Sequence, residues 1–204
     1  MAKYGFRNNK VLVKEIEYPS KVLHSEVFPN TAAVGSAAIL AGWDVSAGTA
    51  AKDNTDFLIQ PPYPLCIQVH AAVAGTAGAG DKLLINGYNA KGHLVTEAVS
   101  VAGTAKGSYY SNNAFAHIVS ITPDDAAHKS TDVNIGFDKE IGLAYDLEKE
   151  TDIISLSYDG AYATVDAGRT YTVNTTYDTL TLPTMADGKT VKISYMSKGK
   201  LASQ

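Results

Sequence analysis

Alternation of apolar and polar residues runs through the middle of the chain and predicts β-strands. In residues 65–73, LCIQVHAAV, the odd-numbered positions are apolar and share one face, which is the pattern of a strand buried on one side. Two further runs, 82–88 and 93–101, are joined by Asn89-Ala90-Lys91-Gly92. Asn favours the start of a turn and Gly the left-handed position, so the sequence predicts a β-hairpin here.

Short β-prone runs occupy most of the remaining chain, at intervals of about 8 to 12 residues and without a long stretch of helical period. The expected strands are 11–18, 115–122, 133–137, 141–145, 153–158, 161–165, 171–174, 179–182 and 191–195, with irregular short strands in 31–49. We expect 133–137 and 141–145 to form a hairpin about Asp138-Lys139-Glu140. The fold class is therefore all-β, with a β-sandwich or jelly-roll-like body.

The tetrapeptide Ala-Gly-Thr-Ala begins at Ala47, again at Ala74 and again at Ala102. Its glycine permits backbone angles that other residues resist, so each copy predicts a bend of the chain. Because a hairpin returns the chain to the end it left, we expect the second and third copies at the same end of the sheet.

The positions of the prolines and changes in composition divide the chain into four expected parts. Residues 1–30 read as an extended N-terminal arm, and 31–64 as an irregular β segment ending in a proline-rich linker. Residues 65–145 form the main β-sandwich, and 146–204 form a C-terminal β region, either in the same domain or as a second small β domain. We expect residues 2–18 of the arm to lie on a neighbouring molecule and to add a strand to an open sheet edge.

The charge and composition of the chain limit the kinds of partner that we expect. The net charge is −4 and the sequence pI about 5.7, so the whole molecule has no field that would gather nucleic acid or an anionic membrane, and we expect neither partner. Both ends are basic, which fits either solvated termini or contact with an acidic partner. The first ten residues lack the apolar core of a secretory signal, which predicts a protein made and kept in a cytosol unless a larger particle carries it out.

The residues that could carry chemistry are scattered. His70, His93 and His117 fall on predicted strands, where a lone imidazole is usually structural. The acidic loop at Asp124-Asp125 lacks the register of a calcium loop, and Cys66 reads as a small buried thiol. We therefore expect no enzyme, no cofactor and no metal site.

The segment INGYNAKGHLVTEAVSVAGT, followed by AFAHIVSI and VNIGFDKEIGLAY, resembles a pattern common in structural proteins of tailed-bacteriophage virions. The resemblance spans roughly residues 65–145. The matching residues are Gly87, Asn89, Gly92, Thr96, Glu97, Gly103, Thr104, Ala114, Phe115, Ile118, Ser120, Ile121, Gly136, Ile141, Gly142 and Leu143. The resemblance implies a non-enzymatic virion component of the head decoration or cement (auxiliary capsid) type, folded from β-strands and often trimeric.

The function expected from this resemblance is binding to the outside of a phage capsid and stabilisation of it, after assembly in the host cytoplasm. The expected partners are the major capsid protein of the same virion and other copies of the chain, as a homotrimer. The alternative is a carbohydrate- or receptor-binding β-sandwich module of a phage tail or head fibre, in which Trp43 and clustered tyrosines would stack on sugar rings. The candidate contact residues are Lys3, Tyr4, Phe6, Arg7, Lys10, Val11, Trp43, Tyr109 and Tyr110.

Overall fold

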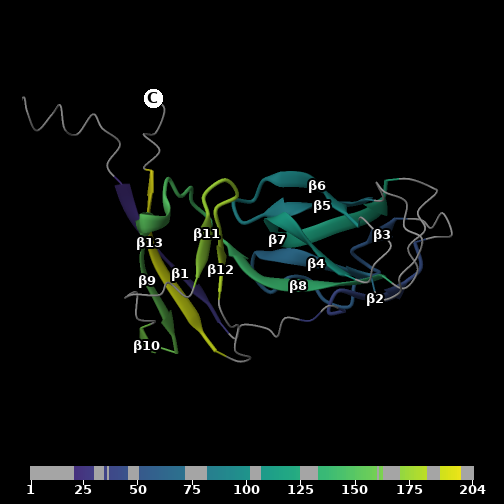
Figure 1. Ribbon diagram of the computed structural model, residues 1–204, viewed down its shortest axis with the longest axis horizontal. Helices are drawn as coiled ribbons and strands as arrows, with labels where there is room; N and C mark the ends of the chain where they lie inside the picture. Colours follow the sequence, from purple (N-terminus) through teal and green to yellow (C-terminus); the bar gives the residue numbers. More distant parts are fainter. Residues whose placement is uncertain are drawn as a thin grey trace, which may run out of the picture.

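A computed structural model shows two antiparallel β-sheets packed into a sandwich-like body, which confirms the all-β fold class (Figure 1). The structure describes residues 21–29, 35, 37–45, 51–71, 82–101, 107–124, 133–159, 161–162, 171–182 and 189–198. Within these residues the one helical turn is a 3-10 turn at Glu150–Asp152. In the described part of the chain, no helix is long and apolar enough to cross a membrane.

The larger sheet contains nine strands and has the order β11-β12-β8-β4-β7-β5-β6, with β2 also paired to β8 and β3 to β7. Its strands are β2 (Leu40–Trp43), β3 (Lys52–Asp53), β4 (Leu65–Ala71), β5 (Lys82–Asn89), β6 (Leu94–Ser100), β7 (Gly107–Pro123), β8 (Val133–Gly142), β11 (Thr172–Asn174) and β12 (Thr179–Thr181).

Strand β7 is long and changes partner at its middle. Its first half pairs with β4, from Ala71↔Gly107 to Leu65↔Phe115, and its second half pairs with β5, from Asn89↔Phe115 to Leu83↔Pro123. A straight strand of 17 residues would span roughly 55 Å. Strand β6 ends at Ser100, one strand away from Pro123 at the end of β7. Residues 101–106 connect Ser100 to Gly107, the start of β7, and can reach only about 25 Å. Strand β7 therefore bends, and the sequence-predicted strand 115–122 is only its second half.

The predicted hairpin is confirmed as β5 and β6, in register from Lys82↔Ser100 to Tyr88↔Leu94. At its turn Gly92 has a φ of 75°, the left-handed conformation expected from the sequence. The Asn89 side-chain oxygen accepts hydrogen bonds from the backbone N–H groups of Lys91 and His93, each at 3.0 Å. Asn89 thus holds the turn in the way its position predicts.

The predicted hairpin of 133–137 and 141–145 is wrong, because β8 runs without a turn from Val133 to Gly142. The β4 ladder is irregular at Asp138-Lys139-Glu140, but β8 stays continuous because Phe137 pairs with Ile67 of β4 before the triplet and the β12 ladder begins at Glu140. Ile141 pairs with Leu65 of β4, and Glu140 pairs with Thr181 of β12. Asp138 is itself a residue that favours turns, so the pairing on both sides of the triplet decides its conformation.

The three Ala-Gly-Thr-Ala tetrapeptides lie outside the described residues, but the strand ends that flank them are placed. Ala71 pairs with Gly107, and Lys82 pairs with Ser100. The connections that contain the second and third tetrapeptides therefore leave and re-enter the sheet between the same two places.

The smaller sheet has the order β1-β13-β9-β10 and lies at the left of Figure 1. Its strands are β1 (Lys21–Phe28), β9 (Ile153–Tyr158), β10 (Ala161–Tyr162) and β13 (Val191–Lys198). Residues 21–28, which the sequence assigns to the end of the arm 1–30, here form a regular strand paired with the C-terminal β13. The predicted strand 11–18 lies outside the described residues.

Buried apolar side chains from both sheets form one continuous core. Phe115, Ile135 and Ile193 are fully buried in it, and Tyr195 of β13 is buried beside them. Strands β11 and β12, from the C-terminal region 146–204, extend the larger sheet rather than the smaller one.

Candidate interaction surfaces and the bend of β7

The bend of β7 is held by the Glu97 carboxylate of β6. One carboxylate oxygen accepts from the backbone N–H and side-chain amide of Asn112, at 2.6 and 2.9 Å. The other accepts from the same two groups of Asn113, at 2.8 and 2.9 Å. Hydrogen bonds to an ionised group are stronger than neutral ones, so the carboxylate replaces the strand partner that β7 lacks at its bend.

Close packing around Phe115 completes the bend. A Cβ on Gly87 would lie 2.3 Å from the His117 backbone oxygen, and one on Gly142 would lie 2.5 Å from the Ala114 Cβ. Residues of the virion-protein pattern that meet at this bend are Gly87, Glu97, Ala114, Phe115 and Gly142. The packing of one bend therefore accounts for five of the sixteen residues that carry the resemblance. The sequence shows these residues but not that Glu97 and Asn112 are neighbours.

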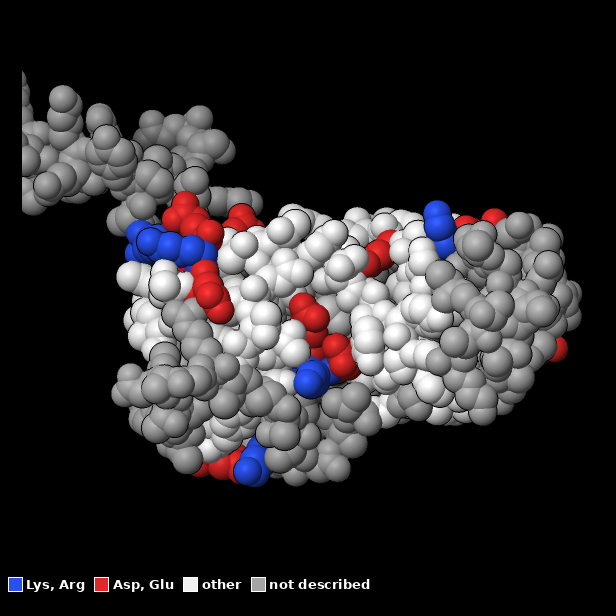
Figure 2. Space-filling model, viewed as in Figure 1, with Lys and Arg blue, Asp and Glu red and all other residues white. Residues whose placement is uncertain are grey.

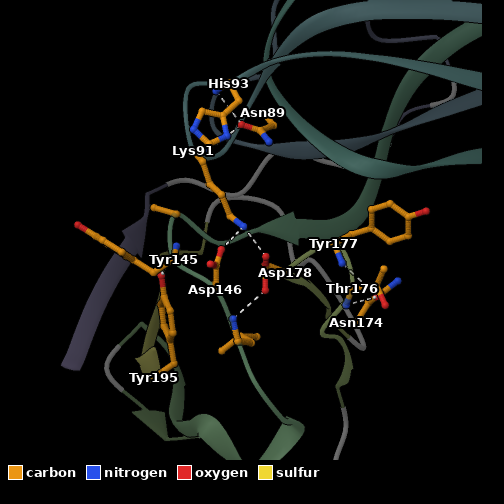
Figure 3. A network of polar contacts seen from close by, with 12 residues as sticks. Asn89, Lys91, His93, Tyr145, Asp146, Asn174, Thr176, Tyr177, Asp178 and Tyr195 are labelled. Carbon is orange, nitrogen blue, oxygen red and sulfur yellow. Dashed lines mark hydrogen bonds and ion pairs between the residues drawn. The ribbon is translucent and has the colours of Figure 1, made fainter. Parts of the chain in front are cut away.

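A second polar network joins the hairpin tip to the rest of the molecule (Figure 3). The Lys91 ammonium lies between the carboxylates of Asp146 and Asp178 and bonds to both. The other Asp178 oxygen accepts from the backbone N–H of Leu147 at 2.7 Å. Asp178 is 6% exposed and has a φ of 54°, so the turn between β11 and β12 holds it in a conformation that few residues adopt.

This network borders a crevice of about 370 Å³, also lined by His93, Asn113, Thr176 and Tyr177. Partial burial lowers the pKa of Lys91, but the hydrogen bonds and charges of Asp146 and Asp178 outweigh it and raise the pKa overall. The amine is therefore held protonated, which favours a structural ion pair over a nucleophile.

His24 and Ser197 form a contact that resembles part of a catalytic site. The His24 Nε2 lies 2.7 Å from the Ser197 Oγ, and its ring stacks on Tyr145 with centroids 3.7 Å apart. A carboxylate would have to orient the imidazole for nucleophilic catalysis. The nearby Glu26 carboxylate instead accepts from the Tyr195 hydroxyl and from the Ala144 backbone N–H. This arrangement supports packing between β1 and the segment after β8.

The acidic residues of β8 are partly buried. Burial raises the pKa of Asp138 and of Glu140, and the Asp138 charge adds to the rise at Glu140. Burial, followed by these two charges, also raises the pKa of Cys66, which is fully buried as the sequence predicts. No group of three or more His, Cys, Asp or Glu side chains in the described ranges could hold a metal ion.

The candidate contact residues taken from the sequence fall into two groups. Trp43 is 5% exposed and belongs to the core, so its ring is not presented as a platform for sugars. Tyr109 packs against the core, whereas Tyr110 is 49% exposed. The remaining candidates, Lys3, Tyr4, Phe6, Arg7, Lys10 and Val11, lie outside the described residues.

A sheet surface that is uncharged apart from Lys82 at its end, and that sequence reasoning missed, covers the outer side of β5, β6 and the second half of β7. The register places Asn86 between Thr96 and Ser120, and Tyr88 between Leu94 and His117. We call this surface the neutral face. Its residues are Leu84, Asn86, Tyr88, Leu94, Thr96, Ala98, Ser100, His117, Ser120 and Thr122, and the charged Lys82, which pairs with Ser100, marks its end. The signal was present in the sequence as Thr, Ser, Asn and Ala at alternate strand positions.

No protein-family model, no curated protein and no solved structure matches the chain significantly.

Proposed function

We propose that the chain is a structural protein of a tailed-phage virion that binds the outside of the capsid and stabilises it as a decoration or cement protein. The observation that carries the proposal is the neutral face. The sequence resemblance to virion proteins also supports it, and five of the residues that carry this resemblance meet at the bend of β7. Its partners would be the major capsid protein of the same virion and other copies of the chain, at the capsid surface.

The chemistry of the neutral face suits a protein interface. The centres of interfaces are depleted of charged residues and enriched in aromatic ones, and here Tyr88 and Leu94 are 43% and 65% exposed. The polar groups bond to one another, because the Asn86 amide donates to Ser120 at 3.1 Å and accepts from Thr96 at 2.5 Å. Desolvating them on binding therefore costs little. Figure 2 shows charged side chains in separate clusters with broad uncharged surface between them.

In the proposed mechanism each copy buries surface against the capsid, and the attachment of many copies stabilises the shell. Stable protein interfaces bury about 1,600 Å² in total, and repeated attachment of identical copies to a shell adds avidity without new contacts. Such a function needs a rigid body and a large contact surface.

Cosedimentation with purified capsids of the virus that encodes the chain tests the proposal. We expect the intact protein to bind and Ala98→Arg, which places a charge within the neutral face, to lose most of the binding. Thr172→Arg is the matched control, because Thr172 is exposed on β11 at the opposite edge of the same sheet. The proposal fails if the intact protein does not sediment with capsids, or if both variants bind as the intact protein does.

A further inference from the structure

Strand β1 leaves one sheet edge open. Within the described residues it pairs only with β13, in a ladder that continues without a bulge from Lys21↔Lys198 to Phe28↔Val191. The other side of this eight-residue strand has no partner strand in the described part of the chain. A long regular edge of this kind is a template for another strand.

The side chains of β1 make the open edge apolar. Val22, Leu23 and Val27 are 46%, 62% and 55% exposed. Natural edge strands are usually protected by charged side chains, prolines or bulges. Here the charged residues are Lys21, at the first position, and Glu26, whose carboxylate accepts hydrogen bonds from Tyr195 and Ala144. Exposed apolar groups beside unpaired backbone favour a strand from elsewhere.

We propose that the occupant of this edge is the segment 11–18 of a second copy of the chain. That segment contains the β-prone residues Val11, Val13, Ile16 and Tyr18, which predict a strand, and only Pro19 and Ser20 separate it from β1. The inference goes beyond the proposed function, since it names the surface through which copies bind one another whatever particle carries them.

Complementary side chains support an antiparallel pairing of 11–18 with 21–28. When the two segments overlap completely, Ile16 lies opposite Leu23, and Leu12 lies opposite Val27. The same register places Glu15 opposite His24, and it sets Glu17 opposite Val22 and Val13 opposite Glu26. The two most exposed large apolar side chains of β1 would thus gain apolar partners, which stabilise cross-strand pairs.

Pro19 argues against the same segment folding back on its own β1. A complete overlap within one chain would need a two-residue turn at Pro19-Ser20. The turns that join strands so tightly require a positive φ at their first central residue, and proline fixes φ near −65°. Exchange with a second copy avoids this turn, and reciprocal exchange closes a symmetric oligomer.

A complementation experiment tests this pairing. One variant lacks residues 2–18 and keeps the edge, and the other carries Leu23→Lys with Val27→Lys and keeps the arm. Sedimentation velocity should find each variant monomeric at concentrations at which the intact chain associates, with a dissociation constant raised at least tenfold. An equimolar mixture should form a one-to-one complex, because the arm of one variant can pair with the edge of the other.

Ile154→Lys is the matched control, because Ile154 is 50% exposed on β9 of the same sheet, away from the open edge. It should leave association unchanged, and circular dichroism should show the same β content for every variant. If the double variant loses that content, Leu23→Lys alone replaces it. A monomeric intact chain, an armless variant that associates as well as the intact chain, or a mixture that stays monomeric would each overturn the inference. Capsid binding is measured separately, so either proposal can fail alone.

Discussion

The bend of β7 and the open edge of β1 both have backbone groups without a partner strand, but only the bend satisfies them within the described part of the chain. At the bend, the backbone N–H groups that lose a strand partner donate to Glu97, and Phe115 is completely buried. At the edge of β1, the backbone has no described partner strand and Leu23 is 62% exposed. At the bend the protein forms the needed hydrogen bonds with its own side chains, whereas β1 is suited to pairing with another molecule. Substitutions at the bend should therefore change stability, and substitutions at the edge should change association.

The largest loss of stability should come from Gly87→Ala. The new Cβ would lie 2.3 Å from a backbone oxygen of β7, which cannot move without breaking the pairing of β5 and β7. We expect a decrease of about 3 kcal/mol in the free energy of unfolding, measured by urea denaturation. Gly107→Ala is the control, because its Cβ would meet nothing closer than 3.5 Å. Equal losses in both variants would contradict close packing at the bend.

Removal of the charge at the bend should have the next largest effect. Glu97→Gln replaces one accepting oxygen by a donor that would face the donors of Asn113 or Asn112. We expect a loss of about 2 kcal/mol, since hydrogen bonds to ionised groups contribute about 1.5 to 3 kcal/mol. Glu148→Gln, at a side chain that is 41% exposed, should cost less than about 0.5 kcal/mol. A neutral Glu97→Gln would show that the carboxylate does not hold the bend.

A smaller loss is expected at the junction of the hairpin tip with the turn between β11 and β12. Lys91→Met leaves the Asp178 carboxylate, which is 8% exposed, without its cation, and should cost about 1 to 2 kcal/mol. Lys52→Met removes a comparable but exposed pair with Asp56 and should cost under about 0.5 kcal/mol. If thermal unfolding shows the same midpoint for the two variants, the junction contributes nothing specific.

The smallest effect should be a pH dependence of the free energy of unfolding, with opposite signs for the carboxyls of Asp138 and Asp152. Burial raises the pKa of Asp138 in β8, so its contribution to stability is largest below its ordinary pKa of 3.8 and is lost as the pH rises through the folded-state value. Burial also acts to raise the pKa of Asp152 beside β9. The hydrogen bond and charge of Lys21, together with the backbone N–H groups of Lys149 and Glu148, outweigh burial and lower the pKa, so that contribution is present above pH 3.8 and is lost as the pH falls.

Urea denaturation between pH 3 and pH 7 separates these two carboxyls. Asp138→Asn should become more stable relative to the intact chain as the pH rises, whereas Asp152→Asn should become less stable. Slopes of the same sign in both variants would contradict the assigned causes.

Local signals in the sequence predicted the parts of the fold that depend on near neighbours. The hairpin of β5 and β6 followed from alternation and from Asn89 and Gly92, and the strand 153–158 appears as β9. The bend of β7 could not be predicted in this way, because it depends on Glu97 meeting Asn112, 15 residues away along the chain. Asp138-Lys139-Glu140 stands between two short apolar runs, which is typical of a turn, whereas pairing of Phe137 with β4 and of Glu140 with β12 keeps β8 continuous.

The candidate sites show the same limit. Trp43 was expected at the surface because tryptophan suits sugar stacking, but its burial depends on residues distant in sequence. The neutral face, by contrast, has a local signal, because uncharged residues stand at alternate positions along the predicted strands 82–88, 93–101 and 115–122.

Hydrogen–deuterium exchange on the intact chain and on the chain lacking residues 2–18 tests the central contrast most directly. In the intact chain, at a concentration where it associates, we expect slow exchange at the bend and along both sides of β1. Without residues 2–18, the β1 amides that point away from β13 should exchange at least tenfold faster, while those around Glu97 should stay unchanged. Identical exchange along β1 in the two proteins, or faster exchange at the bend, would contradict the account.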